Sequence, residues 1–276
     1  MPDAGATRAL PSASANARRR IPREIWPYLR AVTITAMVGL ALACWMVPAI
    51  GLPVLWGLVV PALPLIWVLA PTVWRNVCPM ASANQVPRVL GFTRGRTLPR
   101  WLERYGYTIG AAVFFFAVAL RPSVFESSGI ASGLMLLTAL VAATLGGAIY
   151  RGKSGFCGSV CPLRATQSVY ARAPSGLVPH AHCRPCVGCT TNCQDLLPRQ
   201  SLLADLGDRG TRGASRWVFA GLLPGFIYGF SLLADGASPM RAVWFLAAWS
   251  LFSLGLLTIA DSYTSIGRGR LTAVWG

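Results

Sequence analysis

The chain has 276 residues, of which 54% are hydrophobic and only 12% are charged, and its mean hydropathy is +0.52. Soluble domains carry about 25% charged residues, so this composition excludes an ordinary soluble enzyme and predicts a membrane protein. The net charge of +16 does not indicate a nucleic-acid partner, because the basic residues are confined to particular loops. Eight cysteines, most of them in one short stretch, do not form a disulfide framework.

The first 25 residues predict a disordered basic tail, because they are rich in Ala, Ser, Pro and Arg without apolar periodicity. The arginines at 18–20 and 23 are compatible with a twin-arginine signal. The apolar run that follows is too long for the core of a signal peptide, and no small-residue cleavage site follows it. We therefore favour a basic flank before a signal-anchor helix.

Six apolar segments follow, each close to the ~20 residues that a helix needs to cross a ~30 Å hydrocarbon core. They cover 31–50, 52–70, 107–121, 129–149, 217–235 and 242–260. A backbone in lipid must satisfy its own hydrogen bonds, so all six are predicted to be helices. The expected fold is an all-α polytopic membrane protein with about six transmembrane helices.

This pattern divides the chain into four parts. Residues 1–25 are the tail, and residues 26–150 hold four transmembrane helices with a cytoplasmic Cys-Pro loop at 71–106. Residues 151–216 form a second long loop, which contains six of the eight cysteines. Residues 217–276 hold two transmembrane helices and a short C-terminal tail.

The distribution of basic residues predicts the orientation. Of the 25 Arg and Lys residues, 23 precede the first span or fall in the 71–106 loop, the 150–216 loop and the C-terminal tail. Only Arg121 and Arg241 fall in the other loops. By the positive-inside rule, both termini and both long loops are cytoplasmic, and the expected location is a bacterial inner membrane.

The sharpest chemical signal is Cys183-x2-Cys186-x2-Cys189-x3-Cys193. This is the spacing of bacterial ferredoxins, in which short gaps let one loop wrap an iron–sulfur cluster and present three thiolates to three irons. Residues 151–216 are therefore predicted to form a cytoplasmic ferredoxin-like iron–sulfur loop. A structural zinc site is the alternative, but zinc sites usually pair two C-x2-C units across a longer gap. A disulfide is less favoured because the loop is expected in the reducing cytoplasm.

A weak internal repeat surrounds two Cys-Pro pairs. Val77-Cys78-Pro79-Met80 with Gln85 follows the second span, and Val160-Cys161-Pro162-Leu163 with Gln167 follows the fourth. The second copy extends to Cys157-x3-Cys161. We expect Cys157 and Cys161 to lend ligands to a cluster, with Cys78 as an additional ligand or tuning residue. The alternative interpretation is buried thiols at helix ends.

The number of cysteines limits the number of clusters. Cys44 lies within the first span and is predicted to be a packing residue, which leaves seven cysteines where two fully ligated cubanes need eight. One [4Fe–4S] cluster is expected, and a second centre stays open. The only histidines, His180 and His182, adjoin the run and are either ligands, tuning donors or ordinary loop residues. No predicted span contains a histidine, which excludes a haem b held within the bundle.

These motifs resemble polytopic membrane iron–sulfur proteins of the NapH/NosR type. The resemblance rests on 156–163 (FCGSVCPL), on 77–80 (VCPM) and on the ferredoxin run, and it covers roughly residues 70–200. It implies cytoplasmic clusters that exchange electrons with the membrane, with a quinone pool as membrane partner. Trp74 stands where the first copy would have its first cysteine, one ferredoxin run is present where members often have two, and Gln194 rather than Pro follows Cys193.

The expected function is electron transfer between a cytoplasmic redox partner protein and the membrane, as a component of an oxidoreductase rather than a stand-alone enzyme. Cys183, Cys186 and Cys189 are the expected ligands, with Cys193 or, second, Cys161 as the fourth. One alternative is an accessory factor that supplies electrons for metal or cofactor assembly. Another is a non-redox membrane scaffold whose cysteine loop binds zinc. The expected partners are the lipid bilayer, a redox protein and quinone, with no nucleic acid.

Overall fold

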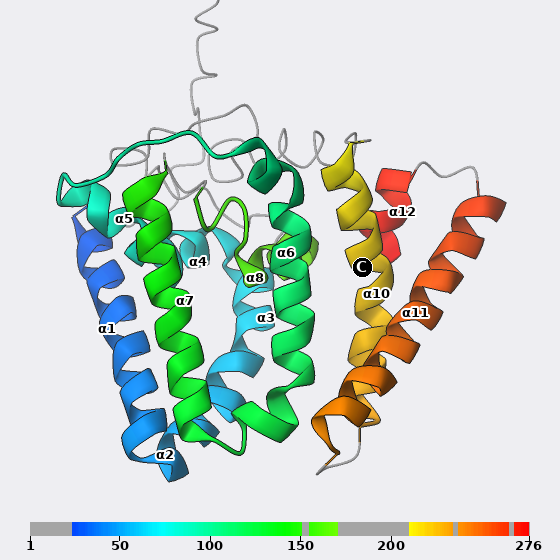
Figure 1. The fold of residues 1–276 in the computed structure, drawn as a ribbon, viewed down its shortest axis with the longest axis horizontal. Coiled ribbons are helices and arrows are strands. Elements are labelled where there is room, and N and C mark those ends of the chain that lie inside the picture. The colour runs from blue at the N-terminus through cyan, green and yellow to red at the C-terminus, as the bar shows by residue number, and fades with distance from the viewer. Residues whose placement is uncertain (1–23, 151–154, 171–209, 234–236, 265–267, 276) are drawn as a thin grey trace, which may run out of the picture.

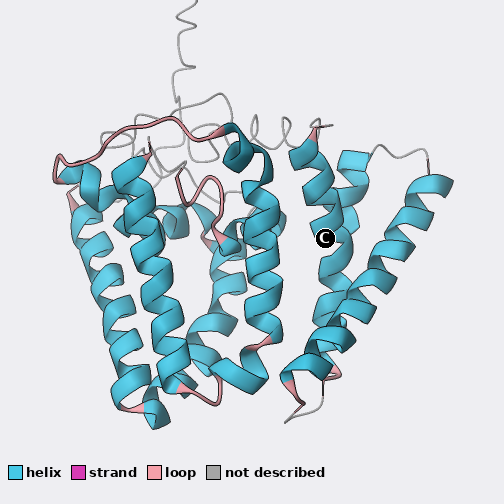
Figure 2. Ribbon diagram, viewed as in Figure 1, coloured by secondary structure: helices cyan, strands magenta, loops and turns pink. Residues whose placement is uncertain are grey.

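The computed structural model describes residues 24–150, 155–170, 210–233, 237–264 and 268–275. Their secondary structure is helical apart from one isolated bridge between Arg96 and Tyr150 (Figure 2). The predicted disordered tail lies outside the described residues except for its last two positions. The ferredoxin run and both histidines also lie outside them.

The described helices form a bundle in which the long members alternate in direction (Figure 1). In chain order they are α1 (Ile25–Met46), α2 (Pro48–Leu52), η1 (Pro53–Val59), α3 (Val60–Leu69), α4 (Pro71–Val77), α5 (Pro79–Val89), α6 (Arg100–Ala119), η2 (Arg121–Phe125), α7 (Gly129–Ile149), α8 (Pro162–Tyr170), α10 (Thr211–Ser231), α11 (Pro239–Tyr263) and α12 (Arg268–Trp275). The elements η1 and η2 are π-helical.

Four of the described helical stretches are long and apolar enough to cross a membrane. They are α1, the stretch Pro48–Leu69, α7 and α11. This confirms that the chain is a membrane protein. Helices α6 and α10 are of similar length, but both carry charged residues within their first two turns, which shortens their apolar part. Their role as spans remains a prediction at this point.

Prolines set the boundaries of the short helices. Pro71 and Pro79 each occupy the first turn of a helix, and Pro162 is the first residue of α8, where the missing amide hydrogen costs nothing. The residue before a proline is pushed out of the helical region. Ala70 and Cys78 accordingly have non-helical backbone angles between successive helices. The chain therefore breaks into short helices immediately after its second long stretch.

Parts of the two segments expected as cytoplasmic loops are packed within the bundle. Helix α5 lies along α7 and α1, and α8 lies against α6 (Figure 1). The side chains of Asn84 and Gln85 on α5 are only 0% and 2% exposed. These short helices enter the bundle because their polar groups find partners there, and Asn84 Nδ2 donates to the Ala143 carbonyl oxygen on α7 at 2.9 Å.

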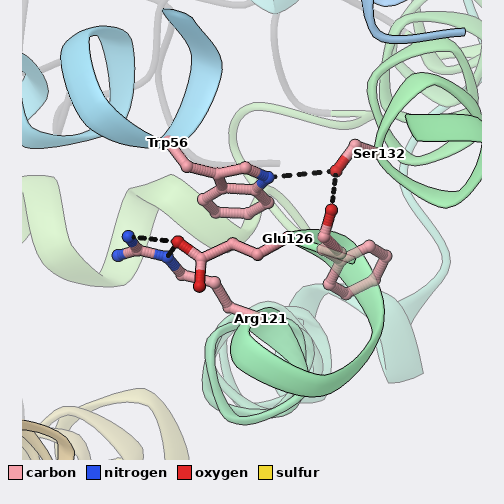
Figure 3. Close-up of polar contacts among 5 residues, drawn as sticks. Trp56, Arg121, Glu126 and Ser132 are labelled. Atoms are coloured by element: carbon pink, nitrogen blue, oxygen red, sulfur yellow. Dashed lines mark hydrogen bonds and ion pairs between the residues drawn. The ribbon is translucent and has the colours of Figure 1, made fainter. Parts of the chain in front are cut away.

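A polar and aromatic network joins the helices at the end of the bundle opposite α5 and α8 (Figure 3). Trp56 Nε1 donates to Ser132 Oγ at 3.0 Å, and Ser132 Oγ donates to the Phe125 carbonyl oxygen at 2.7 Å. Arg121 pairs with Glu126 at 2.7 Å. The Arg121 guanidinium also lies 5.1 Å from the Trp56 ring centroid and 5.6 Å from that of Phe230 on α10. The donors and acceptors of this network satisfy one another, so we interpret the network as structural.

We predict that Gly147→Ala destabilises the protein while Gly39→Ala does not. A Cβ at Gly147 would collide with the Asn84 carbonyl oxygen, whereas nothing lies within 4 Å of a Cβ at Gly39. Overpacking of this kind costs about 1–3 kcal/mol. Thermal unfolding of the two variants in the same detergent measures the difference. Equal midpoint temperatures of unfolding for the two variants would contradict the close packing of α5 on α7.

Candidate metal centre

Three cysteines from two distant segments come together inside the bundle. Cys78, between α4 and α5, and Cys161, before α8, are 6% and 7% exposed and belong to one buried cluster with Met37 and Phe156. Cys157 packs against the same cluster and is partly buried. The structure therefore unites the three cysteines of the two Cys-Pro segments. Cys44 is buried separately, against Leu55 and Trp56, which confirms its packing role.

The two Cys-Pro segments have related local structure. Each cysteine lies immediately before a helix that begins with proline, and each carbonyl oxygen accepts a hydrogen bond from within that helix, Cys78 from Ser82 N at 2.8 Å and Cys161 from Arg164 N at 3.1 Å. Each thiol-bearing residue thus stands at a helix N-terminus, where unpaired amide hydrogens and the helix dipole favour negative charge. Trp74 packs against the cluster at the repeat position that corresponds to Cys157.

The surroundings of Cys161 act on its thiol in opposite directions. Burial, and to a lesser extent the neighbouring Cys78, raise the pKa of Cys161 to about 12, whereas the backbone N–H groups of Leu163 and Arg164 lower it. At neutral pH the uncomplexed residue is therefore a thiol. A metal would have to displace its proton, after which the two N–H groups would stabilise the bound thiolate.

Glycines on α6 and α7 make room for the segment that carries Cys157 and Cys161. A Cβ on Gly106 would lie 2.9 Å from Ser159 Cβ, and a Cβ on Gly110, one turn later, would lie 2.9 Å from the Cys161 carbonyl oxygen. On α7, a Cβ on Gly146 would lie 3.0 Å from Phe156 Cβ. The segment can reach this depth only because these positions lack side chains. The Gly106-x3-Gly110 spacing is typical of close helix packing, and it is the sequence signal that could have indicated this contact.

Several buried donors have no hydrogen-bond acceptor among the described residues, and Trp74 is one that packs against the cysteine cluster. They include Trp74 Nε1 and Ser82 Oγ, and Ser82 lies one turn after Cys78. Arg30 Nη2 also has no hydrogen-bond acceptor among the described residues, although Arg30 Nε donates to the Asn76 carbonyl oxygen at 3.2 Å. Burial of such donors is costly without an acceptor.

A chain of hydrogen bonds runs along α5 from the interior to its end. Gln85 Nε2 donates to Asn84 Oδ1 at 3.2 Å, and Arg88 Nη1 donates to Gln85 Oε1 at 2.8 Å. Arg88 Nη2 donates to the Tyr150 carbonyl oxygen at 3.0 Å. These contacts fix α5, and with it Cys78, against the end of α7. In the sequence, Gln85 is recognisable only as a repeat position. Nothing in the sequence indicates that Asn84 and Arg88 form hydrogen bonds with it.

The three cysteines share a buried cluster but do not form a metal site by themselves. Within the described ranges, no group of three or more His, Cys, Asp or Glu side chains could hold a metal ion. The remaining predicted ligands, Cys183, Cys186, Cys189, Cys193, His180 and His182, lie outside the described residues.

Comparisons with known proteins found no matching family model, no matching curated protein and no matching solved structure.

We predict that Cys161 in metal-free protein is alkylated slowly by iodoacetamide at pH 8. Its pKa is raised from 9.0 to about 12, so its thiolate fraction at pH 8 falls about a thousand-fold, and reaction should accelerate only as the pH rises toward 12. The alkylation is stopped at successive times, and mass spectrometry of the Cys161 peptide measures the rate. The same protein denatured in urea is the control, and equal rates in the folded and denatured states would contradict the buried placement.

Proposed function

We propose that this chain is a membrane-bound iron–sulfur protein that transfers electrons between a cytoplasmic redox partner and the membrane. The observation that carries the proposal is the ferredoxin spacing of Cys183, Cys186, Cys189 and Cys193. The convergence of Cys78, Cys157 and Cys161 on one buried cluster is the second line of support.

The ferredoxin run is proposed to hold a [4Fe–4S] cluster through Cys183, Cys186 and Cys189. Cys193 is the preferred fourth ligand, because Cys161 is enclosed in the bundle beside Cys78. When bound, such a cluster supplies a one-electron redox couple whose potential depends on hydrogen bonds to its sulfurs and on burial. The polypeptide supplies the ligands, the donors and the position in the membrane.

We infer six membrane spans, with the cysteine site on the cytoplasmic side. Helices α6 and α10 run beside the four apolar spans and connect their ends in alternation (Figure 1). Arg121 opens η2 and Arg241 lies in the first turn of α11, both at the end of the bundle opposite α5 and α8. The other 23 basic residues lie outside these two loops, and the positive-inside rule therefore supports a cytoplasmic side at α5 and α8.

The membrane partner is proposed to be a quinone pool, on the NapH/NosR resemblance alone. The same resemblance leaves an accessory role in metal or cofactor assembly as the second candidate. Both functions require the same iron–sulfur centre. Zinc bound without sulfide would instead favour the scaffold alternative.

We predict that alkaline phosphatase fusions alternate in activity along the chain. The enzyme is active only outside the cytoplasm, so fusions after Ser127 and Ser238 should be active and fusions after Thr93 and Gly210 inactive. These pairs flank α6 and α10, the two helices whose spans are proposed. Equal activity on both sides of either helix, at matched expression, would show that this helix does not cross the membrane.

We predict that Cys186→Ser or Cys189→Ser abolishes the visible absorbance and the EPR signal of the cluster in the run without preventing membrane insertion. These residues supply two of three central thiolates, and loss of either opens the cluster to dissociation. Cys44→Ser is the matched control, because Cys44 packs in a separate apolar cluster. Retention of full iron and sulfide content in the Cys186 and Cys189 variants would refute the assignment of the run.

A further inference from the structure

The chain between α5 and α6 crosses the end of the bundle at which α7 ends (Figure 1). Its backbone is held there by hydrogen bonds to the last carbonyl groups of α7. Arg94 N donates to the Ala148 carbonyl oxygen at 2.7 Å, and Arg96 N donates to that of Ile149 at 2.9 Å. The last carbonyl groups of a helix have no partner within the helix, so this connection caps α7 as it passes.

A glycine sets the start of this connection. Gly91 has a φ of +81°, in the left-handed region, and Phe92 N donates back to the Pro87 carbonyl oxygen at 3.0 Å. This is a common way to end a helix, and it directs the chain away from α5. It leaves the side chains of Leu90 and Phe92 exposed by 65% and 56%. Their exposure therefore follows from a defined backbone conformation.

Residues 90–104 present arginines together with large apolar side chains. They contain four arginines and one glutamate. The side chains of Arg94, Arg96 and Arg100 are exposed, and none of them forms an ion pair or hydrogen bond with the described residues. Trp101, in the first turn of α6, is 59% exposed. The segment is thus positively charged along its length and apolar near both of its ends.

Helix α7 places this segment at the membrane surface. The helix has 21 residues and is apolar enough to cross a membrane. Its length of about 31 Å matches a hydrocarbon core of about 30 Å. Its last residue therefore lies where acyl chains meet lipid headgroups, a level at which exposed aromatic and basic side chains are favoured. This placement depends on α7 alone and not on α6 or on any iron–sulfur centre.

We propose that residues 90–104 form a binding surface for anionic phospholipid. The guanidinium groups of Arg94, Arg96 and Arg100 bind the lipid phosphates, for which their planar geometry is suited. The exposed side chains of Leu90 and Trp101 contact the adjoining acyl chains. A zwitterionic lipid carries its own cation beside the phosphate, and an acidic protein matches only the charge. An anionic lipid matches both the arginines and the apolar side chains, so the inference goes beyond the proposed electron transfer and is independent of it.

The test is native mass spectrometry of the purified full-length protein with added phosphatidylglycerol or phosphatidylcholine of identical acyl chains. Wild-type protein should bind phosphatidylglycerol more tightly. Each basic residue at an anionic surface contributes about five-fold in affinity, so the triple variant Arg94→Gln, Arg96→Gln, Arg100→Gln should lose roughly a hundred-fold for phosphatidylglycerol alone. Arg241→Gln, which removes an exposed arginine at the opposite end of the bundle, is the control and should keep the preference.

Two further measurements exclude a trivial loss of fold. The triple variant keeps the backbone N–H groups that cap α7, so its thermal unfolding without added lipid should match that of wild type. Replacing the same three arginines by lysine should retain most of the preference, because the charge is kept. In wild-type protein, the preference should also fall as the ammonium acetate concentration rises, since salt screens exposed charges.

Four results would overturn the proposal. They are equal affinity of wild type for the two lipids, an unchanged preference in a folded triple variant, a preference insensitive to salt, and displacement of the lipid by inorganic phosphate at equal concentration. Binding of a polyglutamate peptide through these arginines, without any lipid preference, would instead make the surface a docking site for an acidic protein. None of these outcomes bears on the ferredoxin run, whose iron content is measured separately.

Discussion

The close approach of backbone to backbone at glycines is the constraint on which the rest of this structure depends. Gly147 lets α5 meet α7 at Asn84, and Gly110 lets the Cys161 segment reach α6. Without these contacts, irregular backbone would have to leave the bundle, because lipid offers no hydrogen-bond partners. The packing at glycines therefore decides whether the Cys-Pro segments lie inside the protein or on its surface.

That packing also places the thiols among apolar side chains. Met37 and Phe156 belong to the same buried cluster as Cys78 and Cys161. Arg30 and Ser82 carry buried donors that find no acceptor among the described residues. At the opposite end of the bundle, Arg121 and Glu126 pair with one another.

The long helices could be predicted from the sequence because their apolar length alone requires them. The segment 129–149 was predicted with the bounds that α7 has, and 52–70 corresponds closely to α2 through α3. The membrane class follows from this length. Helices α4, α5 and α8 could not be predicted as parts of the bundle, because they are short and only tertiary contacts such as that of Asn84 with Ala143 place them there.

The candidate site was predictable in its residues and not in its geometry. The repeat pointed to Cys78 and Cys161, but their proximity depends on packing between segments far apart in the chain. The donors on Arg30 and Trp74 have no local motif, so only the structure reveals them. For the ferredoxin run, the opposite holds. Its cysteine spacing alone predicts a cluster, and the run lies outside the described residues.

The measurement that tests the central claim most directly is the ratio of iron and acid-labile sulfide to protein in anaerobically purified wild-type chain, with zinc determined on the same sample. The account predicts iron and sulfide in equal amounts, in multiples of about four per chain, with zinc well below stoichiometric. Stoichiometric zinc with no sulfide would contradict it and make the protein a membrane scaffold rather than an electron carrier.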